Sequence, residues 1–153
     1  MKRVSKPVSE LSSRYLYATD KLTKSSTQSQ GSAVTKTTFD GVEGKEPFDG
    51  SADPSNNRLY VPFGGFWTLM GEAGIDSANF FGVLHIYVDG VEDATLNIAN
   101  ADYTEDGLAS IHWSKDLTTG QYVEFYASFS SSSNNKQVKA GANWRLVCLR
   151  PAE

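Results

Sequence analysis

The chain has 153 residues, a formal charge of −4, and 39% hydrophobic and 12% aromatic residues. This length fits one domain with a short appendage, and this composition is rich enough in apolar residues to exclude global disorder. The charge is unevenly spread, because residues 1–40 have a balance of +4 and residues 41–153 a balance of −8. The acidic body argues against nucleic-acid binding. A basic arm on it favours docking onto an acidic protein, with a solvated tail as the alternative.

Several familiar kinds of segment and site are missing from the sequence. Polar residues follow Met1, so we expect no cleaved signal peptide. No apolar run approaches the roughly 20 residues of a membrane span, so no membrane insertion is expected. The single cysteine, Cys148, lies in an apolar run and is predicted to be a buried thiol. Without a phosphate-binding glycine loop or Cys/His metal spacing, neither a cofactor nor a metal ion is expected.

The first 32 residues differ in composition from the rest of the chain. Residues 1–32 are rich in Ser, Thr, Lys and Gln, and are predicted to form an N-terminal anchor arm and linker before one domain over residues 33–153. Apolar side chains after Pro7 have a rough helical spacing that continues to Leu22, and a helix this short would become ordered only by docking. The predicted anchor residues are Val8, Leu11, Tyr15 and Leu16.

From residue 33 on, short segments of alternating apolar and polar residues recur between turn signals. This pattern is typical of an all-β sandwich, and no helical period is visible. Asp89–Gly90 is a strong signal for a two-residue hairpin turn, and residues 41–57 have the composition of a loop. The predicted strands cover residues 34–39, 58–62, 66–70, 80–88, 91–98 and 144–149.

The strongest alternation lies in residues 108–129, which are predicted to form a hairpin around a turn at residues 118–120. One face of the hairpin is apolar and is assigned to the core, with contributions from Ile111, Trp113, Val123, Phe125 and Phe129. The other face of the second strand is unusual because it carries Tyr122, Glu124 and Tyr126. Aromatic residues on both faces predict burial on both, once within the protomer and once against another molecule.

The order of these segments resembles the globular domain of the C1q and tumour-necrosis-factor superfamily. The passage Leu59-Tyr60-Val61-Pro62-Phe63-Gly64-Gly65-Phe66-Trp67 is similar to a "strand, Pro, Gly, aromatic strand" passage of that family. The strand and turn of residues 83–90 match its next hairpin, and residues 111–125 match its apolar strand, Gly-containing turn and Val-aromatic strand, with Gln121 where Asp is usual. The family's aromatic-small-Gly signature is missing near residues 142–145. The resemblance covers about residues 33–150.

The resemblance implies a two-sheet jelly roll, and in this family three jelly rolls pack around a threefold axis. It therefore implies a homotrimer. Aromatic residues opposite the core face are candidates for the axis, with scattered surface tyrosines as the alternative. The predicted trimer-interface residues are Tyr122, Glu124, Tyr126, His85 and Tyr87.

The sequence offers little for catalysis or for calcium. His85 and His112 are the only histidines, each on the polar face of a predicted strand, and no Gly-x-Ser-x-Gly motif occurs. We therefore predict no enzyme, with a site around either histidine as the alternative. Two acidic loops, residues 49–53 and 102–106, have oxygen ligands that suit Ca²⁺ but lack the spacing of a dedicated calcium loop.

Together these features predict a structural protein of a virus particle. The predicted protein is a homotrimeric bacteriophage head fibre or capsid decoration protein, held on the virion by its arm, with a knob for multivalent adhesion to a host glycan or receptor. The lack of a signal peptide, the lack of a collagen-like stalk and the basic arm motivate this prediction. The alternatives are the receptor-binding tip of a tail fibre and a C1q-like ligand- or carbohydrate-binding module that is not on a virion.

Overall fold

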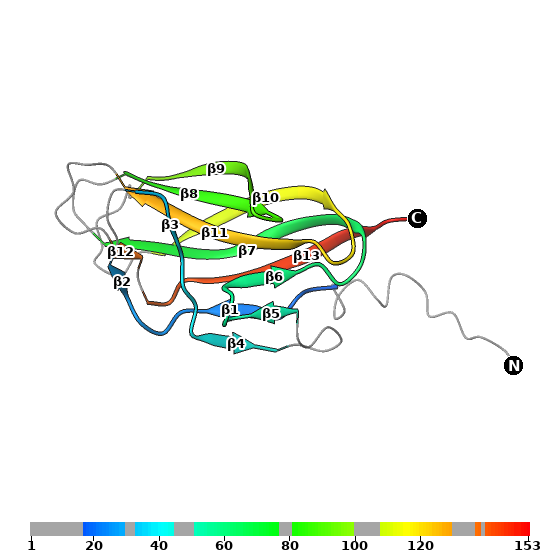
Figure 1. Ribbon diagram of the computed structural model, residues 1–153, viewed down its shortest axis with the longest axis horizontal. Coiled ribbons are helices and arrows are strands. Elements are labelled where there is room, and N and C mark those ends of the chain that lie inside the picture. The colour runs from blue at the N-terminus through cyan, green and yellow to red at the C-terminus, as the bar shows by residue number, and fades with distance from the viewer. Residues whose placement is uncertain are drawn as a thin grey trace, which may run out of the picture.

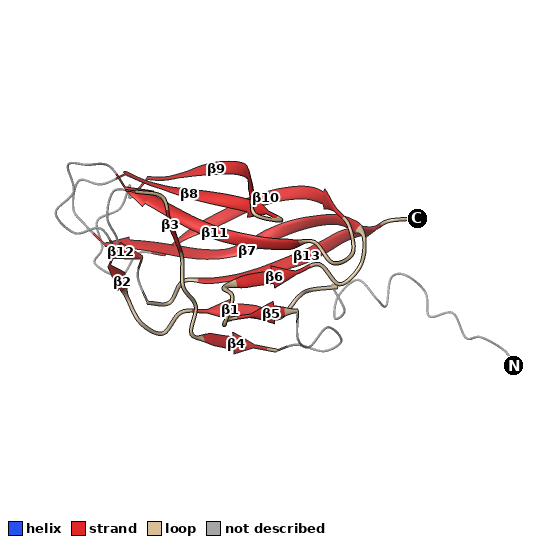
Figure 2. Cartoon of the chain, in the orientation of Figure 1, coloured by secondary structure: helices blue, strands red, loops and turns tan. Residues whose placement is uncertain are grey.

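Two antiparallel sheets stack face to face in the computed structural model (Figure 1). The structure describes residues 17–29, 33–44, 51–76, 81–99, 108–129, 137–138 and 140–153. The described residues contain strands and connecting loops only (Figure 2), which confirms the prediction of an all-β sandwich. Among them there is no helix that would be long and apolar enough to cross a membrane.

The seven-stranded sheet has the long strand β7 at its centre. Its order is β2-β12-β7-β13-β1-β4, with β10 also paired to β7. The strands are β1 Lys21–Thr23, β2 Gln28–Ser29, β4 Gly41–Glu43, β7 Gly65–Asp76, β10 Leu108–Leu117, β12 Gln137–Val138 and β13 Asn143–Pro151. Strand β13 therefore lies inside its sheet, between β7 and β1.

The six-stranded sheet is built around β11 and β8. Its order is β5-β6-β11-β8-β9, with β3 also paired to β11. The strands are β3 Thr35–Lys36, β5 Ala52–Asp53, β6 Arg58–Tyr60, β8 Phe81–Val88, β9 Val91–Ala99 and β11 Tyr122–Phe129. The turn between β8 and β9 is the predicted one, since Asp89 and Gly90 both have positive φ angles, as a type I′ hairpin turn requires.

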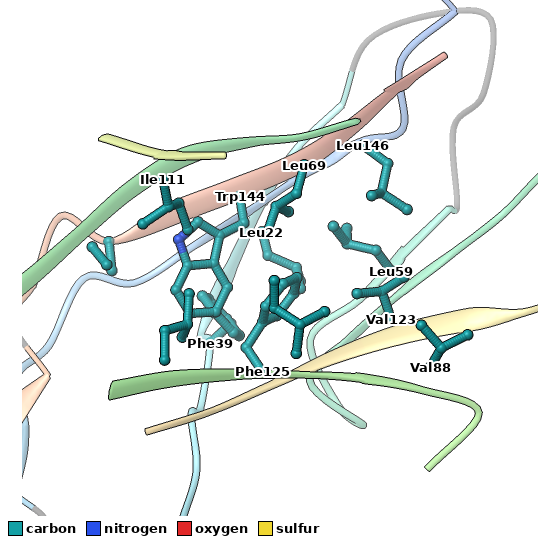
Figure 3. Close-up of a cluster of buried hydrophobic side chains, with 14 of the residues drawn as sticks. Leu22, Phe39, Leu59, Leu69, Val88, Ile111, Val123, Phe125, Trp144 and Leu146 are labelled. Carbon is teal, nitrogen blue, oxygen red and sulfur yellow. The ribbon is translucent and has the colours of Figure 1, made fainter. Parts of the chain in front are cut away.

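The core fills the space between the two sheets (Figure 3). Alternate residues of each strand point inward, so Trp144 and Leu146 of β13 meet Val123 and Phe125 of β11. The Trp144 ring lies 4.0 Å from the Phe125 ring and 5.0 Å from the Phe39 ring, centroid to centroid. The predicted core face of residues 123–129 is confirmed, because Val123, Phe125, Ala127 and Phe129 are buried.

The predicted hairpin over residues 108–129 is wrong. Strand β10 pairs with β7 in one sheet, whereas β11 pairs with β3, β6 and β8 in the other. Residues 118–121 still make a tight turn, in which Gly120 has a φ of 84°. The turn carries the chain across the core instead of folding a strand back onto its neighbour. Ile111 is nevertheless buried in the core, and Trp113 packs partly against it.

The predicted boundary after residue 32 also differs from the structure. Residues 17–29 belong to the sandwich, since β1 pairs with β13 and β4, and β2 pairs with β12. Leu22 is fully buried in the core on β1, so it does not continue a helix. The predicted loop over residues 41–57 contains β4 and β5, and the strand predicted over 34–39 is limited to the two residues of β3.

A network of polar side chains fastens residues 24–28 to residues 36–40. The buried Lys24 amine donates to the carbonyl and the hydroxyl of Thr38, at 2.8 and 3.2 Å. Ser25 donates its backbone N–H and its hydroxyl to the Asp40 carboxylate. These hydrogen bonds from Ser25 lower the pKa of Asp40, and burial lowers the pKa of Lys24. The network holds residues 24–28 against the loop that contains Phe39, which is buried in the core.

Candidate functional site

The predicted interface residues do come together on the outward face of the six-stranded sheet. Tyr122 lies opposite Tyr60 in the register, Glu124 opposite both Arg58 and Tyr87, and Tyr126 opposite both His85 and Lys36. Cross-strand neighbours in an antiparallel sheet point to the same side, so all of these side chains share one face. We call it the tyrosine face, defined by Tyr60, Tyr87, Tyr122 and Tyr126 with the charged residues between them.

A buried carboxylate lies at the centre of the tyrosine face. The same Glu124 Oε1 atom accepts from the Lys36 amine at 2.5 Å and from the Arg58 guanidinium at 2.8 Å. Two cations compensate the cost of removing this carboxylate from water. The Glu124 side chain is only 4% exposed, whereas Lys36 and Arg58 are 29% and 24% exposed. Solvent and ligands therefore meet the two cations and not the carboxylate.

The four tyrosines form two pairs. The Tyr87 and Tyr126 rings lie 4.3 Å apart at an angle of 36°, and the Tyr60 and Tyr122 rings meet edge to face at 6.1 Å. The Arg58 guanidinium lies 4.1 Å above the Tyr122 ring, within the range of a cation–π contact. Burial raises the pKa of both Tyr87 and Tyr126. Their hydroxyls are therefore protonated, and thus able to donate, over an even wider pH range than ordinary tyrosines.

A chain of hydrogen bonds crosses the tyrosine face from β11 to β9. His85 Nε2 lies 2.8 Å from Ser128 Oγ, and His85 Nδ1 lies 2.9 Å from the Glu92 carboxylate. Tyr87 donates its hydroxyl to the same Glu92 oxygen at 3.3 Å. The order hydroxyl, imidazole, carboxylate is that of a serine hydrolase triad. Here these contacts occupy both ring nitrogens and fix the imidazole on the face of a sheet, so the group that this chain of hydrogen bonds presents to solvent is the Glu92 carboxylate, which is 45% exposed.

The seven-stranded sheet has an outward face that the sequence analysis missed. Met70 of β7 is 43% exposed there, between His112 of β10 and Arg145 of β13. Leu149, at the irregularity of β13 between Cys148 and Arg150, is 58% exposed. Beside Met70 the Thr68 and Ser114 hydroxyls bond to each other at 2.9 Å. We call this the β7 face. The alternation of residues 66–70 was the available signal, since it places Phe66, Thr68 and Met70 on the side opposite Trp67 and Leu69.

One end of the β7 face is hollowed into a cleft of about 490 Å³. Phe66 contributes to it between Asp116 and Arg150, which lie opposite Phe66 on the two neighbouring strands. Pro151 and Leu117 add apolar surface. The cleft is mainly apolar, with one charge of each sign close to Phe66.

The remaining predicted residues have varied positions. The anchor residues Val8, Leu11, Tyr15 and Leu16 lie outside the described residues, as do Asp49 and the acidic residues at 102–106. Asp53 accepts from the backbone and the side chain of Asn56, as a turn-forming aspartate does. Among the described residues, no three His, Cys, Asp or Glu side chains gather as metal ligands. Cys148 is buried as predicted, and burial raises its pKa.

The two sheets, with the order β4-β1-β13-β7-β10 facing β5-β6-β11-β8-β9, define a jelly roll of the tumour-necrosis-factor and C1q type. Solved structures share this fold. The Eiger TNF of S. frugiperda is similar with a TM-score of 0.59 and 12% identity, over 89% of this chain and 94% of that one. The globular domain of the zebrafish complement 1qA protein is similar with a TM-score of 0.59 and 10% identity, over 88% and 98%.

A third structure, murine APRIL at pH 8.0, has a TM-score of 0.55 and 13% identity, over 86% of this chain and 98% of that one. No family model matches the sequence, and no curated protein matches it. At these identities the likeness shows the fold, which confirms the jelly roll that the order of segments predicted.

Proposed function

We propose that the chain is a homotrimeric structural protein of a virus particle, a head fibre or capsid decoration protein. Its N-terminal arm attaches it to the particle, and its jelly roll is presented to the host surface. The jelly-roll fold and the basic arm on an acidic body support this proposal. The observation that carries the trimer is the exposure of two large apolar side chains, Met70 on β7 and Leu149 on β13.

The protomers are proposed to meet through the β7 face and not through the tyrosine face that the sequence favoured. On the tyrosine face the rings already pair with each other, and Glu124 is already neutralised by two cations of the same protomer. On the β7 face, Met70 remains 43% exposed beside the short side chains of Thr68 and Ser114, and Leu149 remains 58% exposed at the irregularity of β13. Burying such a side chain fully contributes about 1.5–3 kcal/mol, and three copies repeat the gain.

A charge placed at the centre of the β7 face should dissociate the trimer. We expect Met70→Asp to give a folded protein at the monomer mass of 16.7 kDa in light scattering, whereas the unchanged chain has three times that mass. Removal of a charged group from water costs several kcal/mol and therefore opposes burial of this face between protomers, even though Arg145 lies beside position 70. The matched control is Val91→Asp, which replaces another exposed apolar residue, 69% exposed at the β8–β9 turn, and should leave the trimer intact. A monomeric unchanged chain, or a trimeric Met70→Asp variant, contradicts the proposed contact.

The attachment role of the arm is testable without damage to the sandwich. Deletion has to stop at residue 16, because residues 17–29 contribute β1, β2 and the buried Leu22. We expect the chain without residues 1–16 to remain trimeric and to keep its thermal unfolding temperature but to lose co-sedimentation with purified particles. A variant in which Lys2, Arg3, Lys6 and Arg14 are replaced by Gln should lose it in part, and added salt should weaken the attachment of the unchanged chain more than that of the variant. Undiminished co-sedimentation of the truncated chain excludes the arm as the anchor.

A further inference from the structure

We infer that the tyrosine face is a binding surface for acidic sugars, that is, for oligosaccharides that carry a carboxylate group. The inference names the ligand class for the host-surface role proposed above. It requires that the protomers meet through another face, so that the tyrosine face stays open. Its basis is the combination of paired tyrosines, two accessible cations and a fixed imidazole–carboxylate pair on one flat sheet.

The tyrosines supply the part of the surface that a sugar ring requires. Tyrosine combines an apolar ring with a polar hydroxyl, so it contacts both the C–H groups and the hydroxyls of a sugar. Ring–ring contacts between Tyr60 and Tyr122, and between Tyr87 and Tyr126, hold all four side chains in place before a ligand arrives. A surface ordered in advance loses little conformational entropy on binding.

The charges select an acidic ligand. Around Tyr122 and Tyr126 the accessible charged groups are Lys36, Arg58 and Asp53, which lies opposite Arg58 in the register, while the Glu124 carboxylate is nearly buried. Two cations thus offset two carboxylates at this point of a domain that is otherwise strongly acidic. An arginine guanidinium presents several donors in a planar fork that fits a carboxylate. The acid group of the sugar is therefore placed at the end of the tyrosine face where β3 and β6 pair with β11.

The opposite end of the tyrosine face fits uncharged hydroxyl groups. Glu92 is 45% exposed and is held by His85 and Tyr87, so it offers an acceptor of fixed orientation. A carboxylate group of a ligand would be repelled at this end. The two ends together orient an oligosaccharide, with its acidic residue at Lys36 and Arg58 and its neutral residues towards Glu92.

A protein partner fits the tyrosine face less well. The buried centre of a protein interface is enriched in tyrosine and arginine but depleted of lysine and glutamate, and here Lys36 and Glu124 lie at the centre of the face. Six large hydrophobic side chains are exposed among the described residues, and none of them lies on β6, β8 or β11, the strands that carry the four tyrosines. They are Tyr17, Val34, Val42, Met70, Val91 and Leu149. The tyrosine face therefore lacks the aliphatic centre of a protein contact and has the planar polar groups of a sugar site.

Calorimetric titration of the full chain with two acidic probes and their neutral counterparts tests the inference. The probes are sialyllactose against lactose, and trigalacturonic acid against maltotriose, so that two sources of the carboxylate are separated. We expect at least one acidic probe to bind about tenfold more tightly than its counterpart, which is the effect of about one good charge-assisted contact. Added salt should reduce this preference. Absence of binding by both acidic probes, or equal binding of acidic and neutral ones, overturns the inference.

Two variants locate the site, and a third is a control. Lys36→Gln keeps a donor for Glu124 but removes a charge, so the preference for acidic over neutral probes should fall. Tyr60→Ala should weaken binding of every probe. Tyr17→Ala removes an exposed tyrosine that packs on Phe63, away from the tyrosine face, and should change nothing. If Lys36→Gln and Tyr60→Ala both bind the probes as the unchanged chain does, the sugar site does not lie on the tyrosine face.

Light scattering of the same samples separates this inference from the proposed trimer. A folded trimer that binds no acidic sugar contradicts the inference alone, and a monomer that binds one contradicts the trimer alone. If the tyrosine-face variants change the mass of the assembly, this face is a contact between copies of the chain and the sugar site is excluded.

Discussion

Replacement of Trp144 by alanine is expected to lower the free energy of unfolding by about 3–5 kcal/mol, the range for a large aromatic residue removed from a core. Trp144 is fully buried on the central strand β13, and its ring contacts those of Phe39 and Phe125. Its indole N–H donates to the Glu72 carbonyl at 3.1 Å. Alanine would leave a cavity between the sheets and remove this hydrogen bond. Chemical denaturation followed by Tyr fluorescence or circular dichroism measures the loss.

Trp113→Ala is the matched control for Trp144→Ala. Trp113 only packs against the edge of the core, and its N–H donates to Asp93 in an exposed position at 3.1 Å. Its removal should cost less than half as much, because water refills the space and replaces the hydrogen bond. Equal losses for the two tryptophans would mean that the core is not centred on the Trp144–Phe125 contact.

The substitution Gly71→Ala should destabilise the protein by about 3 kcal/mol, at the upper end of the usual cost of overpacking. A Cβ atom at Gly71 would overlap the backbone oxygen of Asn143 and the Trp144 ring. The overlap with a backbone atom is the decisive one, since a side chain can rotate away but the paired strands β7 and β13 have to separate. We expect a lower denaturation midpoint with an unchanged denaturant dependence.

Gly64 provides the control for Gly71. A Cβ atom there would meet the Ala152 Cβ at 3.5 Å and the Leu117 oxygen at 3.7 Å, which are ordinary contacts. Gly64→Ala should therefore be neutral, or stabilising by up to about 1 kcal/mol through the reduced freedom of the unfolded chain. If Gly71→Ala and Gly64→Ala change the free energy of unfolding equally, the close approach of β13 does not explain why position 71 requires glycine.

The sequence predicted the faces of the long strands well because burial follows residue alternation directly. Leu84, Ile86 and Val88 point into the core and His85 and Tyr87 point outward, as their alternation indicated. The Asp89–Gly90 turn was predictable for a local reason, since few other residue pairs adopt two positive φ angles at low cost. Such features depend only on neighbours in the chain.

Strand partners were less predictable, because they depend on distant segments. Residues 108–129 would show the same alternation whether the two strands paired or lay in opposite sheets, and Gly120 suits either turn. The two- and three-residue strands β1 to β5 are too short to show an alternation of apolar and polar residues, so only the structure reveals where they lie. Leu22 is an example, since its burial on β1 depends on pairing with Trp144, more than a hundred residues away.

In the candidate site, too, the faces of single strands were predictable, whereas the contacts between distant strands were not. The sequence placed Tyr122, Glu124 and Tyr126 on one face together with His85 and Tyr87, which the register of β8 and β11 confirms. It did not reveal that Lys36 and Arg58 converge on Glu124, because each cation comes from a different distant strand. Because these partners were not evident, the sequence analysis assigned Glu124 to the contact between protomers, although its charge is neutralised within one protomer.

The central place of β13 has a consequence for how the protein is made. Residues 143–151 separate β7 from β1, so the seven-stranded sheet has no continuous hydrogen bonding until they have left the ribosome. Until then, most of the chain keeps its apolar strands exposed to water. Strand pairing over such sequence distances is also slow. During synthesis the nascent chain is therefore expected to need protection against aggregation, and the folded sandwich forms only after its last strand is inserted.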